Sequence, residues 1–186
     1  MGYLRLAHPA TFGPTDSGCI EAFDRELDYL FENLRRLGAA PREIEDLAQD
    51  VFVVLHKNWL TLDLSRPLRP YLFGVAFRVV CAHRRRRARE IPHPSPDAED
   101  SGTSPEGLLE SKQSTSLLMA ALDRVPLSRR AVLVMHDLDG IPIVEIARNL
   151  SISRFGTYAR LRKGRKELSR AVERLLRIPG GTPTGR

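Results

Sequence analysis

The feature that most constrains the fold is the stretch 141–168, which has the pattern of two short helices separated by a turn. Apolar residues recur at helical spacing in the first of them: Ile143, Ile146, Ala147 and Leu150. Ser151 and Ser153 then interrupt the helix, and either hydroxyl can cap a new one by accepting an exposed backbone N–H. The pattern therefore predicts a helix-turn-helix.

The second helix of this pair is predicted to have two different faces. Thr157, Leu161 and Leu168 fall on one inward line. The opposite face carries mostly basic residues: Arg154, Tyr158, Arg162, Lys163 and Arg165. A helix that is apolar on one side and basic on the other fits a DNA major groove. The same pattern also describes an ordinary helical hairpin with a solvated basic face.

The charge of the chain favours a polyanionic partner. The net charge is +6 and the sequence pI is about 9.8. Between residues 154 and 177 there are nine Lys or Arg and two Asp or Glu, a balance of +7. The basic charge is thus concentrated at the end of the chain, as in proteins that bind nucleic acid.

The first third of the chain predicts two helices that pair antiparallel. Apolar residues repeat at three-four spacing from 20 to 37, where Gly38 ends the first helix. Pro41 begins the second helix, which extends to Trp59. The outer face of the second helix is polar, and it is either solvated or a docking surface for a basic partner helix. Its members are Glu43, Asp46, Gln49, Asp50, Val53 and Lys57.

Residues 60–70 are predicted to form a loop, because Pro67 and Pro70 disfavour a helix there. Residues 71–83 are almost wholly apolar and should pack between the first two helices. The aromatics of this part are Trp59, Tyr71, Phe73 and Phe77, of which Trp59 and Phe77 are expected in the core. Arg84, Arg85, Arg86, Arg87 and Arg89 follow, and form either a phosphate-binding patch or a basic helix end.

The remaining pattern divides the chain into two helical domains. Four prolines and an acidic run mark residues 90–113 as a linker. We expect an all-α fold with two small helical domains joined by this Pro/acidic linker. The expected boundaries are a flexible tail at 1–17, a first domain at 18–89, the linker at 90–113, a second domain at 114–178 and a tail at 179–186.

Several classes of function lack support in the sequence. Cys19 and Cys81 do not suggest a disulfide framework, and Cys81 is expected to be a small buried residue. No run is long enough to insert into a membrane and no signal-peptide core is evident, so we expect a soluble cytoplasmic protein. There is no P-loop, dinucleotide-binding glycine pattern or metal-spaced His/Cys set. We therefore expect no enzyme, no cofactor and no metal site.

Taken together, these residues resemble an extracytoplasmic-function (ECF) sigma factor, the minimal bacterial type that keeps only the second and fourth conserved regions. The region-two resemblance is in IEDLAQDVFVVLHKNW and RPYLFGVAFRVVCAHRRRR. The region-four resemblance is in LDRVPLSRRAVLVMHDLDGIPIVEIARNL and ARLRKGRKEL. The resemblance covers about residues 20–89 and 114–176.

The resemblance implies a promoter-directing partner of core RNA polymerase, with three sets of contact residues. The set facing the clamp helices of the largest polymerase subunit is Asp46, Leu47, Gln49, Asp50 and Val53. The set that melts and reads the start-proximal promoter element is Arg66, Arg69, Tyr71, Phe73, Arg78, Arg84, Arg85, Arg86 and Arg87. The set that reads the upstream element, beside the polymerase flap, is Ser153, Arg154, Phe155, Tyr158, Arg162, Lys163 and Arg165. The resemblance also implies an anti-sigma protein as a partner, because family members are commonly regulated by one.

The chain departs from the family pattern at several positions. Tyr71 stands where Trp is usual, Arg78 where Asn is usual, and Ala82 near a usual Asp. Gly156 and Thr157 replace Thr-Val, and a glycine inside a helix costs about 1 kcal/mol relative to alanine. These departures bear on which promoter is read.

The expected mechanism is capture of unpaired bases by aromatic faces, each worth about 1–3 kcal/mol. Two promoter elements two duplex turns apart lie roughly 70 Å from each other. The linker averages roughly 27 Å as a free coil and reaches about 80 Å when extended. We therefore expect the domains to sit closer in the free chain, with weak DNA binding until polymerase spaces them.

Three alternatives remain open from the sequence. A conventional helix-turn-helix regulator explains 141–168 equally well, but not the arginine cluster or the aromatics before it. An enzyme lacks a recognisable site. A purely structural role for residues 46–57 is the third, and polymerase binding that survives charge reversal at Asp46 and Asp50 would favour it.

Overall fold

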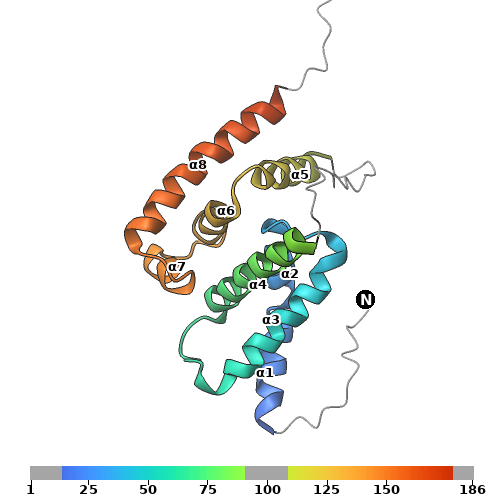
Figure 1. Cartoon of the computed structure of the whole chain (residues 1–186), viewed down its shortest axis with the longest axis vertical. Helices are drawn as coiled ribbons and strands as arrows, with labels where there is room; N and C mark the ends of the chain where they lie inside the picture. The colour runs from blue at the N-terminus through green and yellow to red at the C-terminus, as the bar shows by residue number, and fades with distance from the viewer. Residues whose placement is uncertain (1–13, 91–108, 178–186) are drawn as a thin grey trace, which may run out of the picture.

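The structure is a computed structural model that describes residues 14–90 and 109–177, with side chains at 17–89 and 113–177. Every secondary-structure element in these ranges is a helix, so the predicted all-α class is confirmed (Figure 1). Residues 1–13, 91–108 and 178–186, which include most of the predicted tails and linker, lie outside the described residues. The helices α1 (Pro14–Arg25) and α5 (Leu109–Asp123) begin a few residues inside the predicted tail and linker.

The first half of the fold is a bundle of four α-helices. Its elements are α1 (Pro14–Arg25), α2 (Leu27–Arg36), η1 (Pro41–Glu43), α3 (Ile44–Asn58), η2 (Trp59–Thr61) and α4 (Leu68–Glu90). The predicted first helix is in fact two, because it is interrupted at Glu26. Gly38 has φ +82°, a left-handed conformation that favours glycine, and it turns the chain from α2 toward Pro41. The antiparallel pairing of α2 and α3 follows from this short connection (Figure 1).

Helix α4 is the centre of the bundle and is longer than predicted. It packs against both α2 and α3, as its apolar sequence led us to expect. The loop before α4 is shorter than the predicted loop at 60–70, because α4 begins at Leu68 and includes Pro70. A proline is tolerated there because the first turn of a helix has no internal partner for its N–H groups. The helix continues through the arginines to Glu90, so these side chains project from a regular helix.

The second half contains the expected helix-turn-helix and the helices that support it. Its elements are α5 (Leu109–Asp123), α6 (Leu127–Leu133), η3 (Val134–Leu138), α7 (Ile143–Asn149) and α8 (Arg154–Leu176). The η3 segment is a π-helical turn that follows α6 directly. Helix α8 packs on α5, α6 and α7, and its buried side chains include Thr157, Leu161 and Ala171.

The two halves pack directly against each other through α4 and α7, and through α2 and α5 (Figure 1). The α4–α7 contact is tight at Gly74, where a Cβ atom would lie 2.8 Å from the carbonyl oxygen of Asn149. Arg78 Nη1 donates a hydrogen bond of 2.9 Å to that same oxygen. A glycine on α4 therefore lets the C-terminal end of α7 rest on the helix backbone.

Candidate nucleic-acid interface

The start of α8 has an N-cap and one face packed against the protein, as expected for the second helix of a helix-turn-helix. Ser153 has extended backbone angles, and its Oγ accepts a hydrogen bond of 3.0 Å from the N–H of Gly156, which makes it the N-cap. Ser151, the other predicted cap, has φ +54° and makes the turn. Thr157 and Leu161 are buried, as predicted, so one face of α8 is fixed against the body of the protein.

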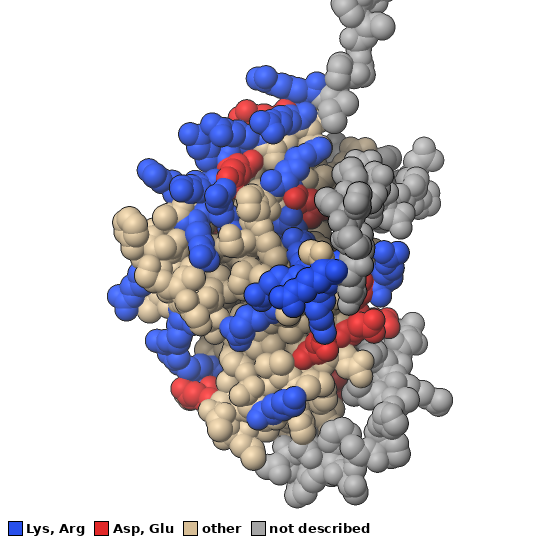
Figure 2. Space-filling view, viewed as in Figure 1, with Lys and Arg blue, Asp and Glu red and all other residues tan. Residues whose placement is uncertain are grey.

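The other face of α8 is exposed and basic (Figure 2). The predicted upstream-element residues are exposed without exception: Ser153, Arg154, Phe155, Tyr158, Arg162, Lys163 and Arg165. Two of them are large and apolar, since Phe155 is 84% exposed and Tyr158 is 60% exposed. The structure thus brings all seven residues to one solvent-facing helix surface.

Arg165 differs from the other basic residues because it already has a protein partner. Its Nη2 and Nε donate hydrogen bonds of 2.6 and 2.9 Å to the two carboxylate oxygens of Asp137 in η3. This bidentate contact is the main reason that the pKa of Asp137 is lowered. Arg165 is therefore oriented by the π-helical turn, which the sequence did not predict.

Replacing Ser153 with alanine is expected to reduce the free energy of unfolding by about 1 kcal/mol, because the N–H of Gly156 loses its acceptor. Urea unfolding followed by circular dichroism measures this change. The control is Ser169→Ala, an exposed serine in the middle of the same helix, where alanine is neutral or slightly stabilising. Equal effects of the two substitutions would mean that the cap does not stabilise α8.

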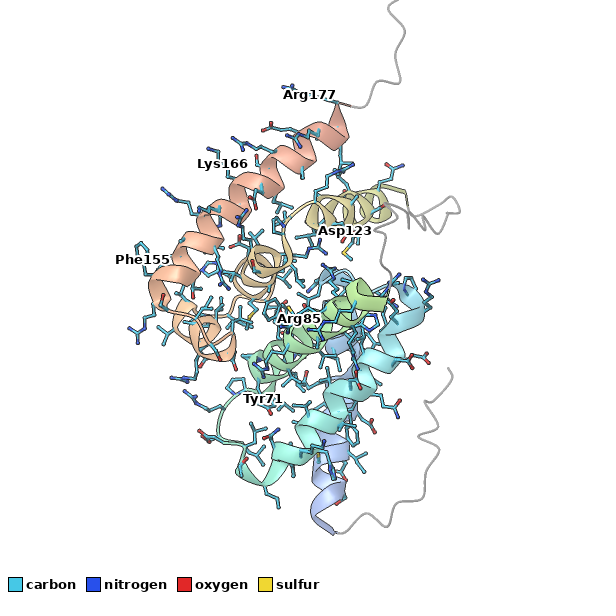
Figure 3. The ribbon with its side chains drawn as sticks, viewed as in Figure 1. Tyr71, Arg85, Asp123, Phe155, Lys166 and Arg177 are labelled. Carbon is cyan, nitrogen blue, oxygen red and sulfur yellow. The ribbon has the colours of Figure 1, made fainter. Side chains whose placement is uncertain are left out.

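The loop before α4 forms a pocket of about 250 Å³. It is lined on one side by loop residues and Tyr71, and on the other side by Glu145, Arg148 and Asn149 of the helix-turn-helix. Tyr71 is one of the aromatic residues predicted to stack on bases. It is half-buried near the start of α4 (Figure 3), and its side chain lines this pocket. Arg66 is exposed and lies 3.6 Å from Asp63, whereas Arg69 donates a 2.7 Å hydrogen bond to Glu26 and lies over the ring of Tyr29.

Phe73 corrects one prediction, since its side chain is 0% exposed in the core between the helices. A ring in that position cannot present its face to a base, so Phe73 is excluded from the candidate site. The helical period explains the difference, because two positions along α4 from Tyr71 is more than half a turn away. Phe77 and Trp59 are partly buried and pack against the core, as expected.

Three arginines at the end of α4 contact the protein itself. Arg84 donates to the carbonyl oxygens of Leu37 and Gly38, the two residues that follow the end of α2. Arg86 lies 3.5 Å from Asp50, and Arg87 donates a 2.8 Å hydrogen bond to Glu43. Arg85 bonds only to a carbonyl of its own helix and projects from the exposed side of α4 (Figure 3). The arginine cluster therefore fits both predictions made from the sequence. Part of it stabilises the end of the bundle through contacts with the protein, and part of it leaves positive charge at the surface that could bind phosphate.

A polar contact that the sequence did not predict joins the two halves at Asp139. Tyr29 donates a 2.7 Å hydrogen bond to one Asp139 oxygen, and Arg36 lies 3.2 Å from the other. The Asp139 side chain is 8% exposed. Burial raises the pKa of Asp139 and also that of Tyr29. Tyr29 and Asp139 are 110 residues apart, and no sequence motif links such distant positions.

The outer face of α3 is open to solvent. Asp46, Gln49 and Asp50 are exposed, and Val53 is 43% exposed. Leu47 is 2% exposed, so this member of the predicted polymerase-binding set belongs to the core. The exposed members share one helix face and form a small acidic surface, which we call the α3 surface (Asp46, Gln49, Asp50 and Val53).

Within the described ranges there is no group of three or more His, Cys, Asp or Glu residues placed to hold a metal ion. None of the helices described at 14–90 and 109–177 is both long and apolar enough to cross a bilayer.

Two family models match this chain, one for each half. The model of sigma-70 region 2 matches residues 22–90, and the model of sigma-70 region 4 matches residues 115–168. Together they cover about two thirds of the sequence. The boundaries agree with the two ranges in which the sequence resembled a sigma factor.

Individual relatives agree with these models. The chain is 23% identical over 162 residues to the ECF RNA polymerase sigma factor SigW of Bacillus subtilis, covering 80% of this chain and 85% of that protein. Its fold is similar to the sigma factor RpoE, solved with the anti-sigma factor NepR from Bartonella quintana, with a TM-score of 0.66 and 18% identity. That match covers 82% of this chain and 98% of RpoE.

A second solved structure, CnrH in complex with the cytosolic domain of CnrY, has a TM-score of 0.59 and 22% identity. The match covers 86% of this chain and 90% of the solved chain. The family models, the SigW similarity and the arrangement of the helices lead to one conclusion. The chain belongs to the sigma-70 family as an ECF sigma factor, a transcription initiation factor that directs RNA polymerase to specific promoters.

Proposed function

We propose that this sigma factor holds a promoter at two places, with α8 on the upstream element and with the loop 62–67 and α4 on the start-proximal element. The observation that carries the proposal is the exposed basic face of α8, whose opposite face is buried against the protein. A helix fixed in this way enters the major groove with its N-terminal turns first.

The upstream contacts divide by position along α8. Arg154, Phe155 and Tyr158 lie in the first turns, from which a recognition helix reaches base edges. Arg162 and Lys163 lie further along and bind phosphates. Arg165, which Asp137 holds in place, also points its remaining N–H groups at the DNA backbone. Ser153 supports this surface by capping the helix.

The start-proximal contacts centre on the pocket beside Tyr71. An unpaired base that enters this pocket stacks on the tyrosine ring, which is worth about 1–3 kcal/mol. Arg66 lines the pocket, and Arg69 lies next to lining residues in the first turn of α4. Arg78 lies further along α4 and is exposed. The arginines at 84–87 extend the positive surface along the same helix and hold the backbone of the melted strand.

The closed packing of the two halves conflicts with this use of α4. Arg78 donates its hydrogen bond to the carbonyl oxygen of Asn149, and Glu145 and Arg148 line the pocket beside Tyr71. We propose that residues 18–89 and 114–178 move apart as two bodies on the linker 90–113 when polymerase binds. The free chain then binds DNA weakly, because its start-proximal surface is partly covered by its own helix-turn-helix.

Replacing Gly74 with alanine is expected to loosen the closed packing without harming the first bundle. The new Cβ would lie 2.8 Å from the Asn149 oxygen, and the nearest neighbours of this position are all atoms of Asn149. Alanine also stabilises a helix by about 1 kcal/mol relative to glycine. Small-angle scattering of the free chain should give a larger radius of gyration, and affinity for single-stranded start-proximal DNA should rise.

The matched control is Gly18→Ala in α1, where the nearest side-chain atom would lie at an ordinary 3.9 Å. This variant has the same helical gain and should keep the radius of the parent. If Gly74→Ala scatters like Gly18→Ala and binds DNA no better than the parent, the closed packing does not restrict DNA binding.

The α3 surface is the proposed contact for the clamp helices of polymerase, because it presents two carboxylates and an exposed valine on one face. The flap of polymerase is the proposed neighbour of α8. RpoE and CnrH were solved with NepR and with the cytosolic domain of CnrY. We propose that this chain likewise answers to an anti-sigma protein, acts in the cytoplasm, and carries no catalytic group, metal or cofactor of its own.

Reconstituted transcription tests the proposal. Core polymerase with and without the purified chain is incubated with genomic DNA fragments, and the 5′ ends of the transcripts are mapped. New start sites that share two spaced sequence elements are expected. A conventional helix-turn-helix regulator would instead leave the start sites of core polymerase unchanged, so that outcome contradicts the proposal.

A further inference from the structure

The first turn of α8 carries an aromatic side chain that the protein itself does not use. Phe155 is 84% exposed and does not pack against the hydrophobic core. Figure 3 shows that it points away from α7 and the rest of the molecule into solvent. Burying a phenylalanine side chain is worth about 1.5–3 kcal/mol, and this gain is left unused in the free protein.

The position of Phe155 suits a contact with a base and not with a phosphate. It is the second residue of α8, directly after Ser153 and Arg154. Side chains of a helix lean toward its N-terminus, so the ring extends beyond the first turn, toward the groove that the helix would enter. Gly156 follows it and has no side chain to crowd the ring.

The charges around the ring indicate what covers it. Arg154, Arg162 and Lys163 are exposed on the same helix surface, which matches a polyanion better than an apolar protein partner. The base edges of the major groove present one apolar group, the C5-methyl of thymine. Tyr158, 60% exposed and one turn further on, extends the apolar surface next to Phe155.

We propose that Phe155 is a specificity-determining residue that recognises thymine methyl groups in the upstream promoter element. This inference rests on the proposed function, since it requires α8 to lie in the major groove. The ring covers the methyl group while Arg154 and Lys163 hold the phosphates on either side. A promoter read in this way carries at least one thymine opposite the first turn of α8.

Uracil substitution tests the methyl contact directly, because it removes only the methyl group and keeps every hydrogen-bonding atom of the base. Holoenzyme is assembled from core polymerase and the full chain, and its affinity is measured for a mapped promoter and for duplexes with single thymine-to-uracil changes. At one or two upstream positions the parent should lose about fourfold in affinity, from about 0.8 kcal/mol for a buried methyl-sized group. Phe155→Ala should bind the thymine duplex more weakly and be indifferent to those same changes.

The control variant is Leu176→Ala, which removes another exposed apolar side chain, 68% exposed, from the far end of α8. It should keep both the affinity and the uracil sensitivity of the parent. The inference is overturned if Phe155→Ala stays as sensitive to uracil as the parent, or if the parent is insensitive at every upstream position. It is also overturned if Phe155→Ala weakens binding to core polymerase itself, because the ring would then contact protein. Absence of any mapped promoter would instead contradict the proposed function.

Discussion

Reversing both carboxylates of the α3 surface, with Asp46→Lys and Asp50→Lys, is expected to abolish stable binding to core polymerase. Like charges forced together at an interface cost several kcal/mol, and the loss of a paired charge costs about 2–5 kcal/mol, so affinity should fall by a factor of about 30 to several thousand. Both side chains are exposed, and Arg86, which pairs with Asp50, is itself exposed, so the fold should lose little stability. Titration of labelled core polymerase with each variant measures the effect.

The matched control reverses two other exposed acids, Glu21→Lys in α1 and Asp28→Lys in α2, and has the same change in net charge. It should bind core polymerase within a few-fold of the parent. Equal weakening by the two double variants would assign the effect to net charge. Unchanged binding by both would mean that residues 46–57 have only a structural role in this bundle.

Replacing Phe73 with alanine is expected to lower the free energy of unfolding by about 3–5 kcal/mol, because it leaves a cavity in the centre of the first bundle. Phe73→Leu keeps most of the volume and should cost about 1.5 kcal/mol or less. Urea unfolding of the full chain by circular dichroism compares the two. Tyr71→Ala, at the half-buried position beside the pocket, should cost less stability than Phe73→Ala and should reduce promoter opening.

These three variants separate the roles of two neighbouring aromatics. Holoenzyme with Phe73→Leu should open a promoter like the parent, and holoenzyme with Tyr71→Ala should not, as measured by permanganate reactivity of unpaired thymines. If Phe73→Ala instead unfolds like the parent but fails to open the promoter, Phe73 contacts DNA and the burial argument is wrong.

The parts of the fold that depend on local sequence were predictable. The apolar repeats located the helices, and Ser153 and Pro41 began helical turns at the expected positions. The helix-turn-helix was the most predictable site, because buried Thr157 and Leu161 fix which residues of α8 remain outside. The helical period was sufficient to place five upstream-element residues on the outer face: Arg154, Tyr158, Arg162, Lys163 and Arg165. Ser153 was expected as a cap, and Phe155 followed only from the family resemblance.

The features that sequence analysis missed depend on contacts between distant segments. Phe73 was assigned outward because the apolar run of α4 has no polar stripe, so its period does not distinguish the core side. The approach of Gly74 to Asn149 and the pairing of Tyr29 with Asp139 join separate halves of the chain. The π-helical turn at η3 positions Asp137 for Arg165, and its sequence resembles any amphipathic helix end.

The structure suggests why the two halves depend on polymerase. Each half presents only part of the proposed promoter-binding surface, and α7 packs on α4 and lines the pocket of the proposed start-proximal part. The proposed opening would break the contacts of Asp139 with Tyr29 and of Asn149 with Arg78. We propose that polymerase compensates for this cost when it binds both halves at the spacing of the two promoter elements.

The most direct test is the affinity of one mapped promoter duplex for the free chain and for holoenzyme, measured by fluorescence anisotropy in the same physiological salt. The account predicts a dissociation constant of about 1 µM or weaker for the free chain, in the range of non-specific binding, and at least about 100-fold tighter binding by holoenzyme. Nanomolar binding by the free chain would contradict the claim that polymerase must separate the two halves before they hold a promoter together.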